Sequence, residues 1–266
     1  MASSLREEKN VILCDIFAFA RKRTKSTSHF MTEAAVSQHL SELCRSGSIE
    51  AIIRKVALEC DDQSVAINWQ DADGRTAFHW AIGLRCWDVA KALMGEPHRC
   101  DVCTIDKDGC SPLMSACAVD APDEIILALL ERCSRTANAE SASLLDTTDS
   151  SGNTAFMLAA SKGNVSAIRK LAHAGCDVFA QNRRGQTALH RSVSRGQMDA
   201  VEELILVCKT LDRKIRIKFI NTQDVEGNTA LHYASLENNQ ELGQYLLRNG
   251  ADREVRNKQG KTFYEL

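Results

Sequence analysis

The stretch Asp224-Val-Glu-Gly227-Asn-Thr229-Ala-Leu-His232 begins with a six-residue pattern, Asp/Asn-x-x-Gly-x-Ser/Thr, that recurs along the 266-residue chain. Other copies of the pattern begin at Asp71, Asp106, Asp149, Asn182 and Asn257. Successive copies lie 35, 43, 33, 42 and 33 residues apart. Two spacings are equal and the other three are longer, so the pattern predicts a fixed structural unit into which extra segments have been inserted.

The fourth copy shows what each unit contains. Asn182 and Gly185 are typical turn residues, and Thr187 is a helix-capping residue before an inner helix predicted over residues 188–194. A second, outer helix is predicted over residues 199–207, with apolar residues on one face. A 33-residue unit of one turn and two helices is the ankyrin repeat, which must stack on its neighbours to bury its apolar face.

The sequence therefore predicts an all-α ankyrin-repeat solenoid of about six to seven repeats, including an N-terminal capping unit. We expect residues 1–30 to form an N-terminal extension and residues 31–266 to form the ankyrin-repeat domain. Two long insertions are predicted near residues 133–148 and 208–223. The first is expected to be a loop with a helical turn, and the structure of the second is left open. Few residues follow Thr262, so the last repeat is expected to be frayed or differently capped.

The turn between the two helices of a repeat calls for a residue that accepts a positive φ. Gly47, Gly163 and Gly196 stand at this position in three units, and Asp120 and Asn238, which tolerate the left-handed conformation, stand there in two more. Arg85 is the exception. The turn at Arg85 is predicted to be strained or shifted.

Composition narrows the classes of partner. The formal net charge is only -2, which argues against nucleic acid as a partner because phosphate binding needs a clustered basic surface. The longest apolar run, residues 11–20, is interrupted by Asp15 and is too short to span a bilayer. The 11 cysteines follow no disulfide framework spacing, so they are expected to be reduced.

No set of residues indicates catalysis, and the chain is interpreted as non-enzymatic and without a cofactor. His79, His190 and His232 share one repeat position, where they are expected to join neighbouring hairpin loops by hydrogen bonds. Cys100 and Cys103, with His98 and Cys110 nearby, form the one metal-like cluster, but a single Cys-x-x-Cys is a weak signal and no metal site is predicted.

The predicted binding surface consists of the hairpin tips and the exposed positions of the inner helices. Charged and aromatic residues at these positions are of the types that anchor protein interfaces, and a solvated face is the alternative. The candidate partner-binding residues are Asp73, Arg75, Trp80, Asp108, Lys162, Arg184, Arg191, Arg195, Tyr233 and Glu237.

Several strings also resemble the gankyrin family of proteasome regulatory-particle assembly chaperones. They include the segments 73–80, 160–162, 186–191 and 225–232. The resemblance implies a partner, the C-terminal domain of an AAA-ATPase subunit of the regulatory particle, and matches Asp73, Arg75 and Lys162 to charged contacts of that family. Independently of the resemblance, we expect a monomer, because the ends of a solenoid can be capped within the chain and no heptad or strand edge invites self-pairing. The reduced cysteines favour the cytoplasm or the nucleus.

The chain departs from the gankyrin pattern at two places. Residues 233–237 read Tyr-Ala-Ser-Leu-Glu where the family has Leu-x-Cys-x-Glu, and Lys107 replaces an aspartate contact. The alternative interpretation is a general ankyrin-repeat adaptor for another intracellular protein.

Overall fold

The structure is a computed structural model, and it describes residues 42–45, 51–52, 66–95, 100–136, 144–209 and 212–266. Most of the predicted capping unit and the whole N-terminal extension lie outside these residues. The chain divides into two compact units, residues 1–101 and residues 102–266. We describe each unit by itself.

In the first unit, one helix pair follows a turn of 3-10 helix. The 3-10 turn η1 spans Ala66–Asn68, the inner helix α4 spans Ala77–Gly83 and the outer helix α5 spans Trp87–Met94. Thr76 caps α4, and the apolar residues Phe78, Ile82 and Leu93 are fully buried. The sequence pattern predicted this arrangement, since Thr76 is the last residue of the first turn motif.

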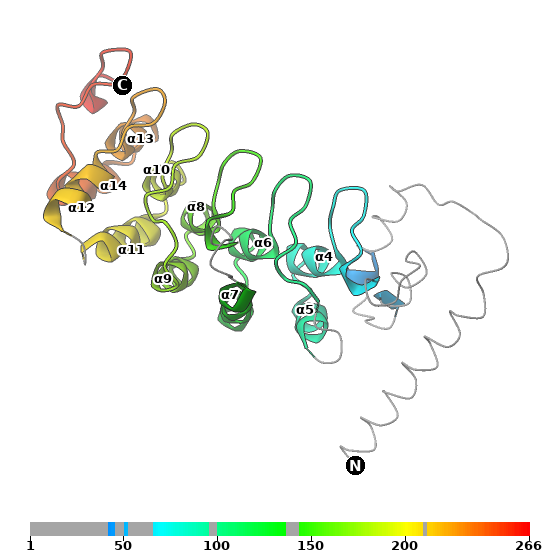
Figure 1. The fold of residues 1–266 in the computed structure, drawn as a ribbon. Helices are drawn as coiled ribbons and strands as arrows, with labels where there is room; N and C mark the ends of the chain where they lie inside the picture. Colours follow the sequence, from blue (N-terminus) through cyan, green and yellow to red (C-terminus); the bar gives the residue numbers. More distant parts are fainter. Residues whose placement is uncertain (1–41, 46–50, 53–65, 96–99, 137–143, 210–211) are drawn as a thin grey trace, which may run out of the picture. The chain divides into compact units, whose positions relative to one another are not determined.

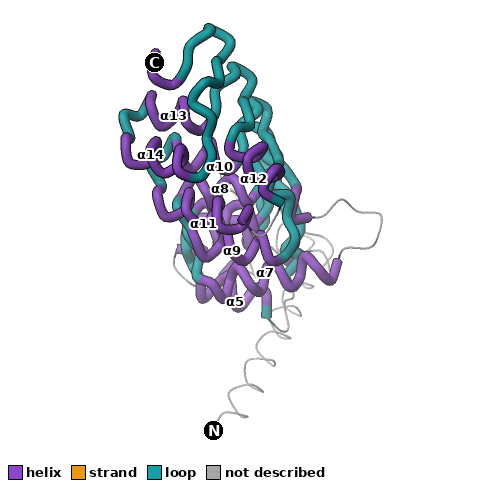
Figure 2. Tube along the Cα trace, turned by 90° about the vertical axis from the view of Figure 1, so that its left-hand side faces the viewer, coloured by secondary structure: helices purple, strands orange, loops and turns teal. Residues whose placement is uncertain are grey.

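The second unit repeats the same pair four times and ends in a short 3-10 helix (Figure 1). Its inner helices are α6 (Pro112–Ala118), α8 (Ala155–Lys162), α10 (Ala188–Val193) and α13 (Ala230–Leu236), and its outer helices are α7 (Asp123–Thr136), α9 (Val165–His173), α11 (Met198–Lys209) and α14 (Gln240–Arg248). Hairpin loops connect one pair to the next, and the described part of this unit contains no strand (Figure 2). The predicted all-α ankyrin solenoid is confirmed.

Both insertions follow outer helices, as their positions in the sequence predicted. The first continues α7 to Thr136 and ends in a 3-10 turn, η2 (Leu144–Asp146). The second contains a complete extra helix, α12 (Arg213–Ile220). α12 buries Phe219, whose ring meets the ring of Phe179 edge-on at a centroid distance of 5.6 Å.

The turns between paired helices adopt positive φ at each position that the pattern selected within the described residues. Gly163 has φ 77°, and a Cβ atom there would lie 2.4 Å from Oε1 of Gln197. Arg85, Asp120 and Asn238 have φ of 60°, 58° and 52°. The turn at Arg85 is therefore not shifted but strained, because a side chain with a Cβ atom is disfavoured in this region.

The last turn motif is followed by η3 (Phe263–Glu265), in the place of an inner helix. Thr262 and Glu265 form a capping box: the Glu265 carboxylate accepts the Thr262 N–H at 2.7 Å. Thr262 thus caps a short helix at the position where Thr187 and Thr229 cap inner helices in the preceding repeats.

Candidate protein-binding surface

The hairpin loops of the second unit are joined by a regular series of backbone hydrogen bonds. In each pair of neighbouring loops, the N–H of the second motif residue donates to the carbonyl of the third residue of the preceding motif. These bonds run from Ser150 to Asp108, Arg183 to Ser151, Val225 to Arg184, and Lys258 to Glu226, at 2.6 to 3.0 Å. The loop tips are therefore held in a fixed register, and the side chains at the tips project from a repeating backbone.

Each turn is built by the side chain of its first residue. The carboxylate of Asp224, for example, accepts N–H groups of Glu226 and Asn228 at 2.9 and 2.8 Å. Asn182 does the same with its side-chain oxygen, and its amide nitrogen donates to Asn153 of the preceding repeat at 2.9 Å. The exposed tips thus rest on buried, fully engaged turn residues.

His190 and His232 have the structural role that the sequence predicted, and His79 contacts Thr76 of its own repeat. Nδ1 of His190 accepts the N–H of Thr187 at 3.1 Å, and Nε2 lies 3.1 Å from the carbonyl oxygen of Asn228 in the next repeat. His232 repeats this geometry with Thr229 and Lys261. Nε2 therefore carries the proton in each, and a neutral imidazole that is engaged on both sides is unsuited to acid-base catalysis.

In the first unit, three predicted site residues come together at one hairpin. Asp73 is exposed at the tip, and the indole Nε1 of Trp80 donates to the buried carboxylate of Asp71 at 2.8 Å. The guanidinium carbon of Arg75 lies 5.3 Å from the centre of the Trp80 ring. This stack of a cation on an aromatic ring forms a rigid, half-buried surface.

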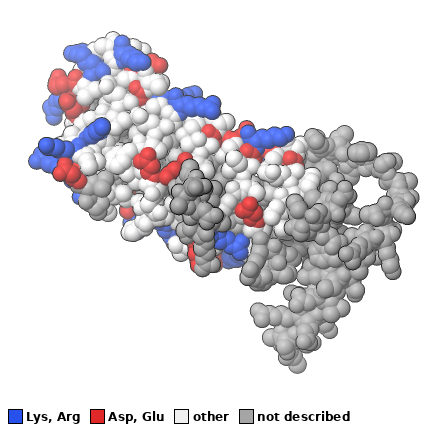
Figure 3. All heavy atoms as spheres, in the orientation of Figure 1, with Lys and Arg blue, Asp and Glu red and all other residues white. Residues whose placement is uncertain are grey.

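In the second unit, five of the predicted residues are exposed, namely Asp108, Lys162, Arg184, Arg195 and Glu237. Arg191 and Tyr233 are half-buried. Lysine and arginine side chains reach the surface along the edge that carries the hairpin loops, with acidic side chains between them (Figure 3). The candidate surface of this unit is therefore of mixed charge, with its arginines concentrated on the fourth repeat.

Tyr233 is held by two residues that the sequence analysis did not select. Its hydroxyl donates to the carboxylate of Asp224 at 2.8 Å and accepts from Nε2 of Gln186 at 2.8 Å. Burial, followed by the hydrogen bond to Asp224, raises the pKa of Tyr233, so the phenol stays protonated at neutral pH. The signal that could have found the pair is periodic: Trp80 and Tyr233 both stand nine positions after an aspartate.

The cysteines of the described residues are free thiols. Among those residues no three His, Cys, Asp or Glu side chains are grouped as metal ligands, and His98 of the candidate cluster lies outside them. Cys103 instead faces Cys133, with the sulfur atoms 4.0 Å apart. Burial raises the pKa of Cys117 to about 12, which makes its thiol a poor nucleophile.

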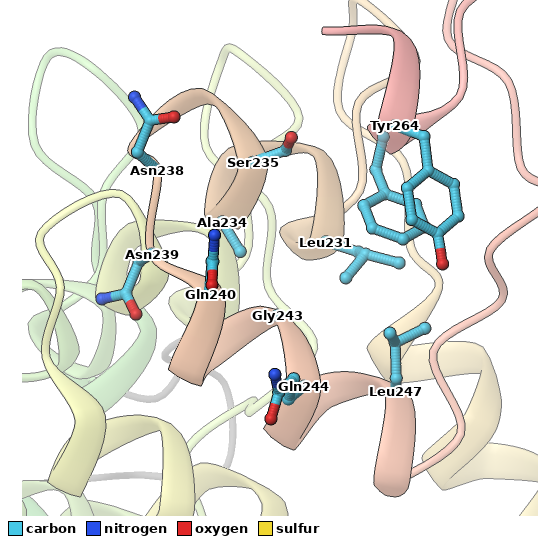
Figure 4. Close-up of a pocket in the computed structure, with 11 residues that line it drawn as sticks. Leu231, Ala234, Ser235, Asn238, Asn239, Gln240, Gly243, Gln244, Leu247 and Tyr264 are labelled. Carbon is cyan, nitrogen blue, oxygen red and sulfur yellow. The ribbon is translucent and has the colours of Figure 1, made fainter.

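One open cavity of about 420 Å³ lies at the end of the second unit, between α13, α14 and η3. Leu231, Leu247 and Tyr264 line one side of it, and amide side chains such as Asn239 and Gln240 line the other (Figure 4). No carboxylate, histidine or cysteine is among its lining residues. Its lining is apolar and amide in character, with the hydroxyl groups of Ser235 and Tyr264.

Comparison with known proteins agrees with this architecture. The family profile described as "Ankyrin repeats (3 copies)" matches residues 40–142, 88–182, 135–216 and 156–257. The chain belongs to the ankyrin-repeat family. Proteins of this family are repeat scaffolds that bind other proteins on an extended surface. No helix within the described residues has the length and apolar character needed to cross a membrane.

Individual relatives match part of this chain and a small part of their own length. A homologue of transient receptor potential cation channel subfamily A member 1 from Caenorhabditis elegans is 31% identical over 45% of this chain and 9% of its own length. Human neurogenic locus notch homolog protein 2 is 29% identical over 58% of this chain and 8% of its own length. This chain thus spans less than a tenth of these two relatives.

The ankyrin-repeat domain of Bcl-3, a member of the IkappaB protein family, has a similar solved structure. It aligns with a TM-score of 0.63 at 22% identity and covers 85% of this chain and 92% of the Bcl-3 chain. At this identity the likeness concerns the fold. These relatives support the ankyrin-repeat family and not the gankyrin family in particular.

Proposed function

We propose that this ankyrin-repeat protein is a non-enzymatic adaptor that binds a protein partner along its hairpin tips and inner helices. One observation carries the proposal: the charged and aromatic side chains of this edge stand on a backbone fixed by regular hydrogen bonds between loops. Such an edge is preorganised, so little conformational entropy is lost on binding.

Within this class, the partner that we propose is the C-terminal helical domain of an AAA-ATPase subunit of the proteasome regulatory particle. The protein would then act as an assembly chaperone, as a monomer in the cytoplasm and the nucleus. The support is the resemblance at Asp73, Arg75 and Lys162. Asp73 and Lys162 are exposed, and Arg75 is half-buried against Trp80, so each has surface to offer a partner.

Affinity purification followed by mass spectrometry tests the identity of the partner. We expect a regulatory-particle ATPase subunit among the recovered proteins, and its isolated C-terminal domain to bind directly. Recovery of other proteins without any such ATPase would reject the chaperone role and leave the general adaptor.

Charge reversal tests the surface. An exposed ion pair contributes about 0.2 to 1 kcal/mol, whereas the loss of one partner of a desolvated pair costs about 2 to 5 kcal/mol. We therefore expect Arg75→Glu with Lys162→Glu to weaken binding of the ATPase domain at least tenfold. The matched control, Arg213→Glu with Lys214→Glu, changes two exposed charges on α12 by the same amount and should leave the affinity within twofold.

A further inference from the structure

On each inner helix, one position stands nine residues after the first residue of the preceding turn, and its side chain differs from repeat to repeat. In two repeats this side chain is polar and bonds to a carboxylate of its own turn: Trp80 Nε1 donates to Asp71, and the Tyr233 hydroxyl donates to Asp224, each at 2.8 Å. A donor on the inner helix and an aspartate at the turn thus form a matched pair within one repeat.

The fourth repeat has the donor but lacks the carboxylate. Arg191 stands at the donor position, nine residues after Asn182. The side-chain oxygen of Asn182 already accepts the N–H groups of Arg184 and Gln186, and its amide nitrogen donates to Asn153 and Gln186. An amide cannot neutralise a guanidinium, so the turn of this repeat supplies no negative charge for Arg191.

The guanidinium of Arg191 shows the consequence of the missing carboxylate. Nε of Arg191 is buried and has no hydrogen-bond partner within the described residues. A buried donor without an acceptor is unfavourable, and a charged one more so. Burial, and then the positive charge of Arg195, lower the pKa of Arg191; the charge of Arg184 adds to this, while Asp149 partly opposes it. Arg191 thus lies near two arginines of its own repeat and one carboxylate, that of Asp149 in the preceding repeat.

Arg184 at the loop tip and Arg195 at the end of the inner helix are both exposed, and Arg191 lies between them in sequence on the same repeat. We define these three residues as the arginine cluster. Its outer members are reachable from solvent, and Arg191 is half-buried. A reorientation of its guanidinium would bring Nε and one terminal nitrogen to bear on an incoming oxyanion, the two-pronged geometry that arginine forms with carboxylates.

We propose that the arginine cluster is a receptor for carboxylate side chains of an acidic segment of the protein partner, with one carboxylate supplying Arg191 with the negative charge that Asn182 does not provide. This deepens the proposed adaptor function and rests on it. Carboxylates are favoured over other anions because a carboxylate fills the equivalent place at Trp80 and Tyr233. The neighbouring basic residue Lys162, which stands at the end of the preceding inner helix, would contact a further carboxylate of the same segment.

The test uses a capped hexaglutamate peptide as the probe, with capped hexaglutamine and inorganic phosphate as comparison ligands, at low ionic strength. The readouts are peptide affinity and the NMR resonance of the Arg191 Nε–H group, which reports on this donor directly. We expect hexaglutamate to bind and to shift that resonance, and hexaglutamine to do neither. Phosphate that shifts the resonance as strongly at equal concentration would overturn the preference for carboxylates.

Substitutions separate the two-pronged contact from simple charge. Arg191→Gln should weaken hexaglutamate binding about tenfold, and Arg191→Lys, which keeps the charge but has no Nε fork, at least threefold. The control Arg213→Gln removes an exposed positive charge from α12 and should change affinity less than twofold. Asn182→Asp, which supplies the missing carboxylate internally, should also weaken binding. Circular dichroism identifies any variant that has lost its helices. If Arg191→Gln has lost them, the affinity of Arg191→Lys for hexaglutamate tests the proposal.

Equal affinity of wild type and Arg191→Lys, or an unmoved Arg191 resonance at saturating hexaglutamate, would overturn the proposal. Neither result would contradict the proposed function if charge reversal at Arg75 and Lys162 weakened binding of the ATPase domain at least tenfold. Conversely, an intact arginine cluster with no response to that charge reversal would reject the proposed partner surface alone.

Discussion

Replacement of His190 by alanine should reveal how strongly the repeats depend on the connections between their loops. The substitution removes the contact to the Asn228 carbonyl in the next repeat and the acceptor for the Thr187 N–H, both in a buried setting. Each hydrogen bond contributes about 1 kcal/mol, and a buried group left without a partner costs about 1–3 kcal/mol. We therefore expect the free energy of unfolding to fall by about 2–4 kcal/mol.

Urea denaturation followed by circular dichroism measures this change. The matched control is His173→Ala, at the exposed end of α9, for which we expect a change within about 0.5 kcal/mol. A loss at His190 no larger than the loss at His173 would refute the argument that the histidine joins consecutive loops.

The same histidine makes stability depend on pH. Burial lowers the pKa of His190 and of His232 in the folded state, below the value of about 6.5 expected for an unfolded chain. The unfolded state therefore takes up protons first as the pH falls. Stability is complete above about pH 6.5 and decreases below it, by at most about 1.4 kcal/mol per pH unit for each histidine. The His190→Ala variant should show a shallower decrease, and an unchanged slope would contradict the assignment.

Three further outcomes are expected. Arg85→Gly should raise the free energy of unfolding by about 0.5–1 kcal/mol because it relieves a φ of 60°, and Gly163→Ala should lower it by at least about 1 kcal/mol; urea denaturation checks both signs. Cys117 and Cys176, whose pKa values are raised to about 12, should react with a thiol reagent at pH 8 only as the protein unfolds, and rapid labelling without urea would contradict their burial. Light scattering should give a mass near 29.4 kDa, whereas twice that mass would refute the monomer.

The sequence was sufficient where each repeat follows one local rule. Thr187 was predicted to cap an inner helix, and the structure confirms this; Thr229 and His232 stand in the same relation as Thr187 and His190 and form the same capping box. The Arg85 turn was also predictable, because its position within the repeat demands a positive φ whatever residue is there.

Features that depend on contacts between repeats or on ambiguous periodicity were harder to predict. Residues 213–220 place Ile215 and Ile217 between basic residues, an alternation that suits a strand as well as a helix, and the structure shows α12 there. Tyr233 was predicted to bind a partner, and the bonds of its hydroxyl to Gln186 of the preceding repeat and to Asp224 were not predicted. The bond from Gln186 joins two repeats, so the sequence pattern of a single repeat could not predict it.

The hydrogen bonds between neighbouring loops also determine how the second unit would respond to mechanical force. Each bond joins one repeat to the next, as in the amide contacts from Asn182 to Asn153 and from Asn257 to Asn228. Such a stack has interactions between nearest neighbours, and its stability is close to a sum over repeats and their interfaces. A pulling force applied at the carboxyl end would therefore detach repeats one after another, in a series of small steps, and the chain would recover its length stepwise on release.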